Sequence, residues 1–190
     1  QVDRDGQGKT ARPSAGEVMP ALDTLLADLT SGDEARAESA CASLTELGDS
    51  AIPSLRDLLD SPDADSRWWA TRTLASLPNL DPGLLLPPLA DAAPEVRQCA
   101  ALGLCSHPSE AATRPLVQAL SDEDSLTADL AAKALVAIGP PAVESLLEVL
   151  KAARPSARLH AMHALSEIAD PRAIRDMISA LSEDSAMLHY

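Results

Sequence analysis

The sequence predicts an all-α fold, a solenoid of about five helix pairs with partial helices at its two ends. Three observations support this prediction. A leucine recurs about every 30 residues, an alanine precedes each of these leucines by four residues, and aromatic residues make up only 2% of the 190 residues. A repeat of this length is one supersecondary unit, and several units must stack to bury a continuous core. A core so poor in aromatic rings favours closely packed helices over a sheet.

The first helix of each repeat, here called helix A, is defined by two columns of equivalent residues. The leucine column is Leu44, Leu74, Leu104, Leu135 and Leu165. The alanine column lies four residues earlier, at Ala40, Ala70, Ala100, Ala131 and Ala161. Residues four apart share one face of an α-helix, so both columns are predicted to be buried. An alanine in every repeat indicates that another helix backbone passes close to that point.

The second helix of each repeat, helix B, also shows two columns four residues apart. The first column is Leu25, Leu55, Leu85, Leu116, Leu146 and Met177, and the second is Leu29, Leu59, Leu89, Leu120, Leu150 and Leu181. Asp81-Pro82 and Asp170-Pro171 are typical helix starts, because aspartate caps a helix and proline suits its first position. Neither helix can bury its apolar stripe alone, so the pairs are predicted to stack.

Residues 17–190 are predicted to form the repeat domain, and the polar, aperiodic residues 1–16 a tail or linker. The domain would begin with a lone B helix at 17–30 and end at 186–190, where a sixth A helix starts and stops. Solenoids need polar caps at their ends, whereas this end carries Met187, Leu188 and Tyr190. The domain is therefore predicted to be truncated at its C-terminal end or to self-associate through it.

The repeat has a recognisable local pattern. In EVRQCAALGL (95–104), an arginine near the helix start is followed by paired small residues and then leucine. This pattern resembles HEAT repeats, and most closely the short bacterial type called phycobilisome-lyase HEAT-like repeats, over about residues 17–190. The resemblance implies a right-handed solenoid with A helices on one face and B helices on the other. Such repeats occur in scaffolds, adaptors, chromophore-lyase subunits and regulators, so the resemblance leaves the function open.

The charge of the chain is unevenly distributed. Residues 1–150 carry 24 acidic and 10 basic side chains, a net charge of −14, whereas residues 151–190 carry five of each. A nucleic-acid partner is not expected, because a phosphate backbone requires a basic footprint. The acidic part either keeps the protein soluble or meets a protein partner with a basic surface. No apolar run reaches 18 residues, so no membrane span is predicted.

The cysteines indicate the expected location. Cys41, Cys99 and Cys105 show no C-x-x-C spacing and are predicted to be reduced thiols that fill small gaps in the core. Reduced thiols favour a cytoplasmic location.

Acidic turns precede most of the A helices. They are SGDE (31–34), SPDADS (61–66), SDEDS (121–125) and SEDS (182–185). Their Ser and Asp residues are predicted to cap the following helix, and the alternative is an acidic rim for a basic partner. Arg67, Arg97 and Arg158 share one position near the start of helix A. They are predicted to pair with acidic turns in a ladder, as in HEAT proteins, which Ala37 and Ala128 interrupt.

Two clusters contain the side chains that metal sites use. They are Asp60, Asp63 and Asp65, and His160, His163 and Glu167. The first lacks the glycine and the distal glutamate of a calcium loop. The second follows a helix whose buried face leaves His163 outside, so a zinc site is not expected either. No Ser, Cys or His shows nucleophile–base spacing, so no catalytic, cofactor or metal site is predicted.

The second repeat departs from its neighbours in both helices. Pro87 and Pro88 fall within its B helix, which should be short or split around residues 86–88, because each proline removes a backbone donor. The result would be a bend in the solenoid or a partner site. The A helix of the same repeat holds both tryptophans of the chain, Trp68 and Trp69.

The two tryptophans cannot face the same core, because helical neighbours point about 100° apart. With Ala70 at the centre of the buried face, Trp69 is predicted to pack at the seam between repeats and Trp68 to stand on the outer face. Arg72 could lie over the Trp68 ring, and Leu102 would extend the apolar patch. Trp68, Arg72 and Leu102 are therefore the predicted partner-binding residues, although a lone exposed tryptophan often has no such role.

Taken alone, the sequence favours a non-enzymatic protein–protein interaction scaffold or adaptor. The alternative, which rests on the resemblance, is a subunit of a bilin-lyase-like or other cofactor-handling enzyme that binds a tetrapyrrole. Such an enzyme should bring aromatic and histidine side chains to one groove, and the chain is poor in both.

Overall fold

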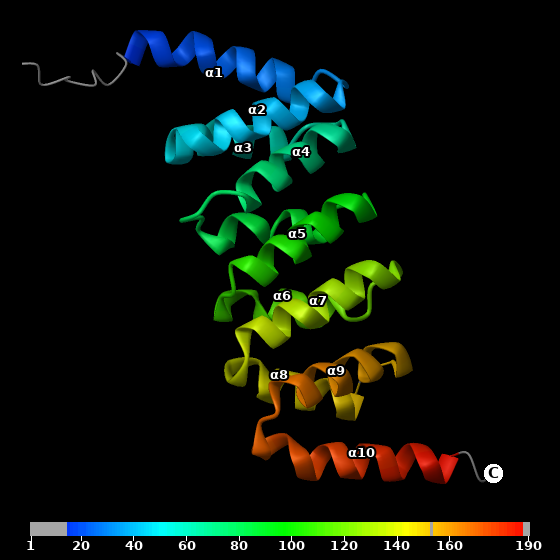
Figure 1. Cartoon of the computed structure of the whole chain (residues 1–190). Coiled ribbons are helices and arrows are strands. Elements are labelled where there is room, and N and C mark those ends of the chain that lie inside the picture. The colour runs from blue at the N-terminus through cyan, green and yellow to red at the C-terminus, as the bar shows by residue number, and fades with distance from the viewer. Residues whose placement is uncertain (1–14, 153, 188–190) are drawn as a thin grey trace, which may run out of the picture.

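The chain forms an α-solenoid in which successive helices stack along one axis (Figure 1). The computed structural model describes residues 15–152 and 154–187, and this part of the chain contains no β-strand. The predicted solenoid is confirmed. The first helix begins at Ala15, and residues 1–14 of the predicted tail lie outside the described residues.

The helices follow the predicted alternation. The A helices are α2 (Glu34–Leu47), α4 (Ala64–Ala75), α5 (Pro94–Ser106), α7 (Ser125–Ile138) and α9 (Pro155–Ile168). The B helices are α1 (Ala15–Leu29), α3 (Ile52–Leu59), α6 (Thr113–Ala119), α8 (Val143–Ala152) and α10 (Ile174–Met187). The four short 3₁₀ turns that lead into α3, α6, α8 and α10 are η1 (Gly48–Ala51), η4 (Glu110–Ala112), η5 (Pro140–Ala142) and η6 (Pro171–Ala173). A lone B helix therefore precedes five repeats.

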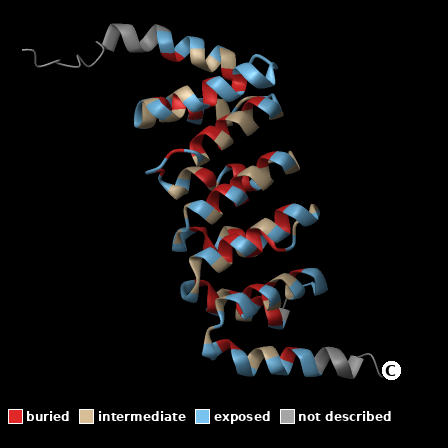
Figure 2. Ribbon diagram, viewed as in Figure 1, coloured by how far each residue is buried: buried red, intermediate tan, exposed pale blue. Residues whose placement is uncertain are grey.

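The core lies where the A and B helices of neighbouring repeats meet (Figure 2). Every leucine of the A-helix column is at most 1% exposed, and every alanine of the companion column at most 2%. Asp33, Asp63 and Asp124 cap α2, α4 and α7, each accepting a hydrogen bond from the backbone N–H three residues on. Glycines with positive φ end two helices, Gly48 after α2 at 61° and Gly139 after α7 at 76°.

The second repeat has no α-helix at its B position. Two 3₁₀ helices, η2 (Pro82–Leu85) and η3 (Pro88–Ala90), stand there instead, as the two prolines predict. Next to them α5 packs tightly against α4, because a Cβ added at Gly103 would lie 2.8 Å from the Cβ of Ala75. The imidazole Nε2 of His107 lies 2.9 Å from the backbone carbonyl of Ala75, at the end of α4.

The C-terminal end differs from the prediction. Helix α10 continues to Met187 without a break, so residues 182–185 are helical and do not form the expected acidic turn. This segment contains neither the proline nor the glycine that punctuates the other repeats. The expected start of a sixth A helix at 186 is therefore wrong for residues 186 and 187, and residues 188–190 lie outside the described part.

Candidate functional site

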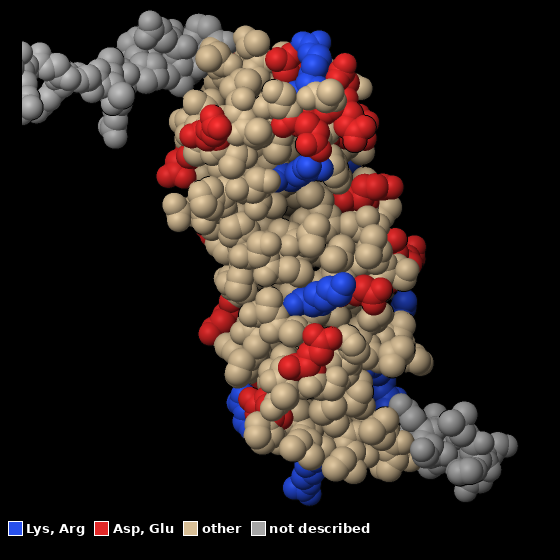
Figure 3. Space-filling view, in the orientation of Figure 1, with Lys and Arg blue, Asp and Glu red and all other residues tan. Residues whose placement is uncertain are grey.

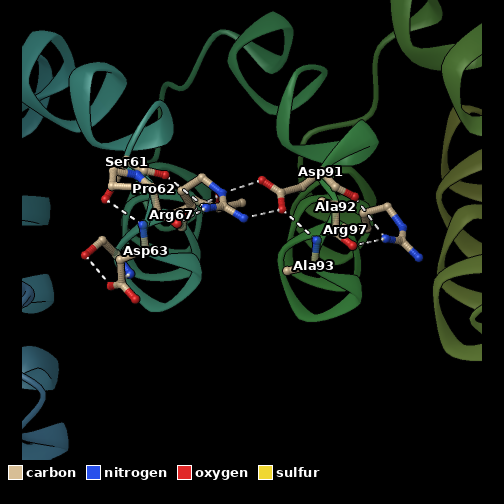
Figure 4. A network of polar contacts seen from close by, with 10 residues as sticks. Ser61, Pro62, Asp63, Arg67, Asp91, Ala92, Ala93 and Arg97 are labelled. Atoms are coloured by element: carbon tan, nitrogen blue, oxygen red, sulfur yellow. Dashed lines mark hydrogen bonds and ion pairs between the residues drawn. The ribbon is translucent and has the colours of Figure 1, made fainter.

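Arginines and aspartates join consecutive repeats in the predicted ladder (Figure 4). The guanidinium of Arg67 donates two hydrogen bonds, 2.7 and 2.8 Å long, to the carboxylate of Asp91 in the next turn. Its remaining nitrogen, Nη1, donates to the backbone carbonyls of Ser61 and Pro62 in the preceding turn. Arg67 thus ties two successive turns together through an ion pair that is largely buried.

Arg97 repeats this arrangement one layer further along the stack. It donates two hydrogen bonds to Asp122, 2.8 and 2.7 Å long, and its Nη1 donates to the carbonyls of Asp91 and Ala92. The ladder is therefore confirmed for two of its three arginines. For the third, Arg158, the acidic side chains expected opposite it include residues from 183 onward, which lie outside the described side chains.

The ladder changes the ionisation of its members. The hydrogen bonds that Arg67 donates to Asp91 hold the pKa of Asp91 below its ordinary value, and those that Arg97 donates to Asp122 raise the pKa of Arg97. Gln98 donates a hydrogen bond to Asp124, which also caps α7, and both contacts lower the pKa of Asp124. These carboxylates therefore stabilise the stack as anions.

The two tryptophans form one aromatic cluster with an arginine. The Trp68 and Trp69 rings meet edge to face, with centroids 4.8 Å apart and an interplanar angle of 82°. The guanidinium carbon of Arg72 lies 5.3 Å from each ring centroid, and its Nη2 lies 2.8 Å from a carboxylate oxygen of Glu38 on α2. The expected Arg72–Trp68 contact is present.

The two rings nevertheless differ less in burial than their positions on the helix predict. Both are half-buried, and Trp69 packs against the core, as expected. Trp68 lies on the outer side of α4, but its ring contacts that of Trp69, so the Trp68 side chain is only partly exposed to solvent. Two adjacent large side chains can reach this contact when rotation about their side-chain bonds brings the rings together.

An apolar groove crosses three neighbouring A helices next to Trp68. We call it the Trp68 groove. It has a volume of about 300 Å³ and is lined by Trp68, Arg72, Glu95, Gln98, Cys99, Leu102, Leu126 and Leu130. The α5 residues follow one stripe of their helix, and α4 and α7 each add two residues one turn apart. The groove thus brings together all three residues predicted to bind a partner, Trp68, Arg72 and Leu102.

Two leucines form the exposed apolar part of this groove. Leu102 is 56% exposed and Leu126 is 49% exposed, so the groove carries apolar surface that is open to solvent. The thiol of Cys99 faces the same groove, and burial raises its pKa to about 11. At neutral pH this thiol is protonated, so it is a poor nucleophile.

A second, acidic hollow lies on the other side of Trp68. It has a volume of about 500 Å³ and is lined by Leu29, Thr30, Ser31, Gly32, Glu34, Asp63, Asp65, Ser66, Trp68 and Trp69. We call it the acidic hollow. Figure 3 shows that acidic side chains gather at the N-terminal end of the visible face, over α1 to α4. Among the residues that line the hollow, Glu34 and Asp65 are exposed.

The side chains of the two clusters that resemble metal sites contact other residues instead. His160 pairs with Asp129 of α7 at 3.3 Å, whereas His163 pairs with Glu167 one turn on at 3.3 Å. Asp63 caps α4 through Ser66. Within residues 15–152 and 154–187, no three metal-binding side chains come together.

Helix α10 exposes three large apolar residues along one face. Ile174, Ile178 and Leu181 are 57%, 62% and 57% exposed, and they follow the i, i+4, i+7 spacing of one helical stripe. The equivalent of Leu181 one repeat earlier, Leu150, is only 4% exposed.

In the described part of the chain, no single helix is long and apolar enough to cross a membrane. Helix α7 and the segment η5–α8 reach that length and hydropathy only together, as a pair bent by 117°.

Comparison with known proteins supports the repeat assignment. Residues 82–154 match the family described as HEAT repeats. This match covers less than half of the chain, and the helix pairs on either side of it follow the same pattern. The matched residues include the split B position of the second repeat and the Arg97–Asp122 rung of the ladder.

Two relatives of this chain concern bilin chemistry. The first is the bilin biosynthesis protein RpcF of Synechococcus sp. (strain WH8020), 43% identical over 91 residues, which are 46% of this chain and 43% of the relative. The match thus spans less than half of that protein's length. The second is a solved structure, the complex of CpcE and CpcF of phycocyanin lyase from Nostoc sp. PCC7120. One chain of it matches with 25% identity and a TM-score of 0.60, over 77% of this chain and 98% of that one.

More distant structures share only the fold. A designed armadillo repeat protein in complex with a (KR)4 peptide matches with 20% identity and a TM-score of 0.52, over 84% of this chain and 87% of that one. An engineered protein matches with 23% identity and a TM-score of 0.52 over 85% of each chain.

The two bilin-related matches correct the functional prediction. The sequence favours a non-enzymatic scaffold, and that interpretation is contradicted, because one relative is named for bilin biosynthesis and the other is part of a lyase. The expectation that the chain has no enzymatic role is wrong for the same reason. The scarcity of aromatic and histidine residues was a poor guide, since an enzyme subunit need not carry the reacting groups itself.

Sequence reasoning missed several residues of the site in these HEAT repeats. Asp91 anchors the ladder although its turn, 91–94, is not among the acidic turns. Glu38 holds Arg72 from the preceding repeat, and Leu126 and Leu130 complete the Trp68 groove. Alignment of the repeats could have found the groove, because Leu130 is the repeat equivalent of Trp69 and Cys99.

Proposed function

We propose that this HEAT-repeat chain is a subunit of a bilin lyase. The observation that carries the proposal is its 43% identity over 91 residues to a bilin biosynthesis protein. The structural likeness to a chain of a phycocyanin lyase complex adds support, because it covers 98% of that chain at 25% identity. Two solenoids can share a fold over only part of their length, whereas this likeness extends over nearly the whole lyase chain.

The part of the chain that the structure describes favours a binding role within such an enzyme. Burial raises the pKa of the Cys99 and Cys105 thiols, so neither is prepared to act as a nucleophile at neutral pH. The Trp68 groove offers an apolar surface with an arginine at its edge. The subunit would therefore hold and orient a bilin or a protein, and a second subunit would supply the remaining chemistry. The phycocyanin lyase that it resembles is a complex of two proteins, CpcE and CpcF.

A direct test is to mix the purified chain with free phycocyanobilin, a linear tetrapyrrole, and to record the visible absorbance. The expected result is a saturable change in the shape and position of the bilin bands. The control is a designed armadillo repeat protein, which shares the fold alone. Identical spectra with the two proteins would contradict specific bilin binding by this chain.

We also propose that two copies of the chain associate through α10. The exposed stripe of Ile174, Ile178 and Leu181 occupies the place that the next A helix covers in the inner repeats. Residues 151–190 have balanced charge, whereas the rest of the chain is strongly acidic, so this end can approach its own copy with little repulsion. The terminal residues Leu188 and Tyr190, which the sequence predicts to take part in this contact, lie outside the described residues.

Light scattering over a concentration series tests the self-association. A dimer that becomes a monomer in an Ile178→Lys variant is expected. Leu159→Lys is the matched control, because Leu159 is 70% exposed on α9, outside the stripe. A monomer at every concentration of the unmodified chain would contradict the proposal.

A further inference from the structure

Trp68 separates two hollows of opposite character. The Trp68 groove on one side is lined mainly by apolar side chains, and the acidic hollow on the other contains Glu34, Asp63 and Asp65. We propose that the two hollows together bind an amphipathic helix of a partner protein. An apolar side chain of that helix fills the groove, and a lysine or arginine enters the acidic hollow. This inference does not depend on the chain's role in a lyase.

The size and lining of the groove fit an apolar anchor residue. A volume of about 300 Å³ is larger than one leucine or phenylalanine side chain needs, and it is at the low end for small-molecule sites. Helices that dock in grooves insert apolar residues at i, i+3 or i+4 spacing. Leu102 and Leu126 are half-exposed at the mouth, and their apolar area would leave water on binding.

The aromatic cluster gives the groove a firm wall. Trp68 is held edge to face by Trp69, and Arg72 lies over both rings while Glu38 fixes its guanidinium. A side chain that is already held loses little conformational entropy when a partner binds. Tryptophan and arginine are also the residue types that most often dominate binding energy in protein interfaces.

Charge identifies the kind of partner. The residues that line the acidic hollow include three carboxylates and neither lysine nor arginine. Glu95 adds a carboxylate at the edge of the groove, and residues 1–150 as a whole carry a net charge of −14. A basic helix is attracted here, whereas the acidic repeats of a second copy are repelled.

The test uses a synthetic amphipathic helix with leucines on one face and lysines on the other. A second peptide with the same leucines and with glutamates in place of the lysines is its matched control. Trp69→Phe leaves Trp68 as the only tryptophan, so its emission reports on the groove directly. We expect the lysine peptide to change Trp68 emission saturably, the glutamate peptide to have no effect, and binding to weaken as ionic strength rises from about 0.05 to about 0.5 M.

Substitutions then separate the groove from the general acidity of the surface. Leu102→Glu should weaken binding of the lysine peptide by about tenfold or more, which corresponds to about 1.4 kcal/mol. Leu159→Glu adds the same charge on an exposed leucine outside the groove and should leave the affinity unchanged or slightly higher. The pair Glu34→Gln and Asp65→Asn should remove most of the salt dependence.

Three results would overturn the proposal. Equal effects of Leu102→Glu and Leu159→Glu would show that the peptide binds elsewhere. Equal binding of the two peptides would remove the role of charge. A bilin that changes Trp68 emission and loses this effect with Leu102→Glu, while the lysine peptide has no effect, would make the groove a bilin site. None of these results requires that the chain be inactive in a lyase, so the two proposals can fail separately.

Discussion

Arg97 and Asp122, which lie 25 residues apart in sequence, are joined by two hydrogen bonds of 2.8 and 2.7 Å across two repeats. The same guanidinium reaches the backbone carbonyls of Asp91 and Ala92 in the turn before it. One planar side chain therefore satisfies acceptors in two successive turns. A lysine ammonium carries the same charge but lacks this forked arrangement of donors.

Arg97→Lys should lower the free energy of unfolding by about 1.5–3 kcal/mol, the range for hydrogen bonds to charged groups. Urea unfolding followed by circular dichroism measures the change. Arg114→Lys on the exposed side of α6 is the matched control and should change stability by less than about 0.5 kcal/mol. If the two variants are equally stable, the ladder contributes charge alone and not geometry.

The stability of the solenoid should decline in acid. Hydrogen bonds hold the pKa values of Asp91 and Asp124 below their ordinary values in the folded protein. A lowered pKa in the folded state means that the stabilisation is complete above the unfolded-state pKa, about 3.9, and is lost as the pH falls toward the folded-state pKa. The urea midpoint should therefore be flat from about pH 7 to 5 and should fall below about pH 4.

Asp91→Asn provides the control for this pH dependence. The variant should be less stable at neutral pH and should lose less stability on acidification, because one titrating carboxylate is gone. A decline that begins near pH 6.5 in both proteins would contradict this explanation and would indicate histidine titration instead.

The two tryptophans should differ in their contribution to stability. Trp69→Ala removes a ring that packs against the core and should lower stability by about 2–4 kcal/mol. Trp68→Ala removes a groove wall and the edge-to-face contact, and should cost about 1 kcal/mol. Denaturant unfolding of the two variants checks the order. Equal losses would mean that Trp68 is part of the core, and not an available binding surface.

Gly103 should resist the addition of a single methyl group. A Cβ there would lie 2.8 Å from the Cβ of Ala75 and 2.9 Å from a methyl group of Leu85. Overpacking of this kind costs about 1–3 kcal/mol, and the gain in helix propensity returns about 1 kcal/mol. Gly103→Ala should therefore destabilise the protein in urea, whereas Ser43→Ala at the equivalent position of the first repeat should not. A stabilised Gly103→Ala variant would show that α4 and α5 can move apart.

Cys99 should react slowly with thiol reagents. Its pKa of about 11 leaves about one thiolate in a thousand at pH 8. Alkylation with iodoacetamide, mapped by mass spectrometry, should label Cys99 much more slowly in the folded protein than in urea. Similar rates in the two conditions would contradict the burial of this thiol.

The sequence was informative wherever burial depends on local periodicity. The leucine and alanine columns predict the helices because each column is a stripe on one helix, and Pro87 and Pro88 predict the split B position for a similarly local reason. The run of α10 through residues 182–185 was missed because acidic residues alone do not end a helix. The ladder was only partly predicted, since the distance from Arg67 to Asp91 depends on how the repeats stack.

The candidate site was harder to predict from the sequence than the fold, because the site depends on contacts between repeats. Helical geometry places Trp68 outside, but its edge-to-face contact with Trp69 and the cover from Arg72 follow from side-chain packing. Leu126 and Leu130 become part of the groove only when α7 is set against α5. The function was predicted wrongly, because residue composition says little about whether a solenoid acts alone or as a subunit of an enzyme.

The most direct test of the account is a lyase assay with phycocyanobilin, apo-phycocyanin and the second subunit of a phycocyanin lyase, with and without this chain. Covalently attached bilin is measured as zinc-induced fluorescence of the phycocyanin band on a denaturing gel. If the chain is a bilin lyase subunit, attachment should require both subunits and should be lost when this chain is omitted or replaced by a designed armadillo repeat protein. Attachment at the same rate and yield without the chain would show that the chain is not a subunit of this lyase.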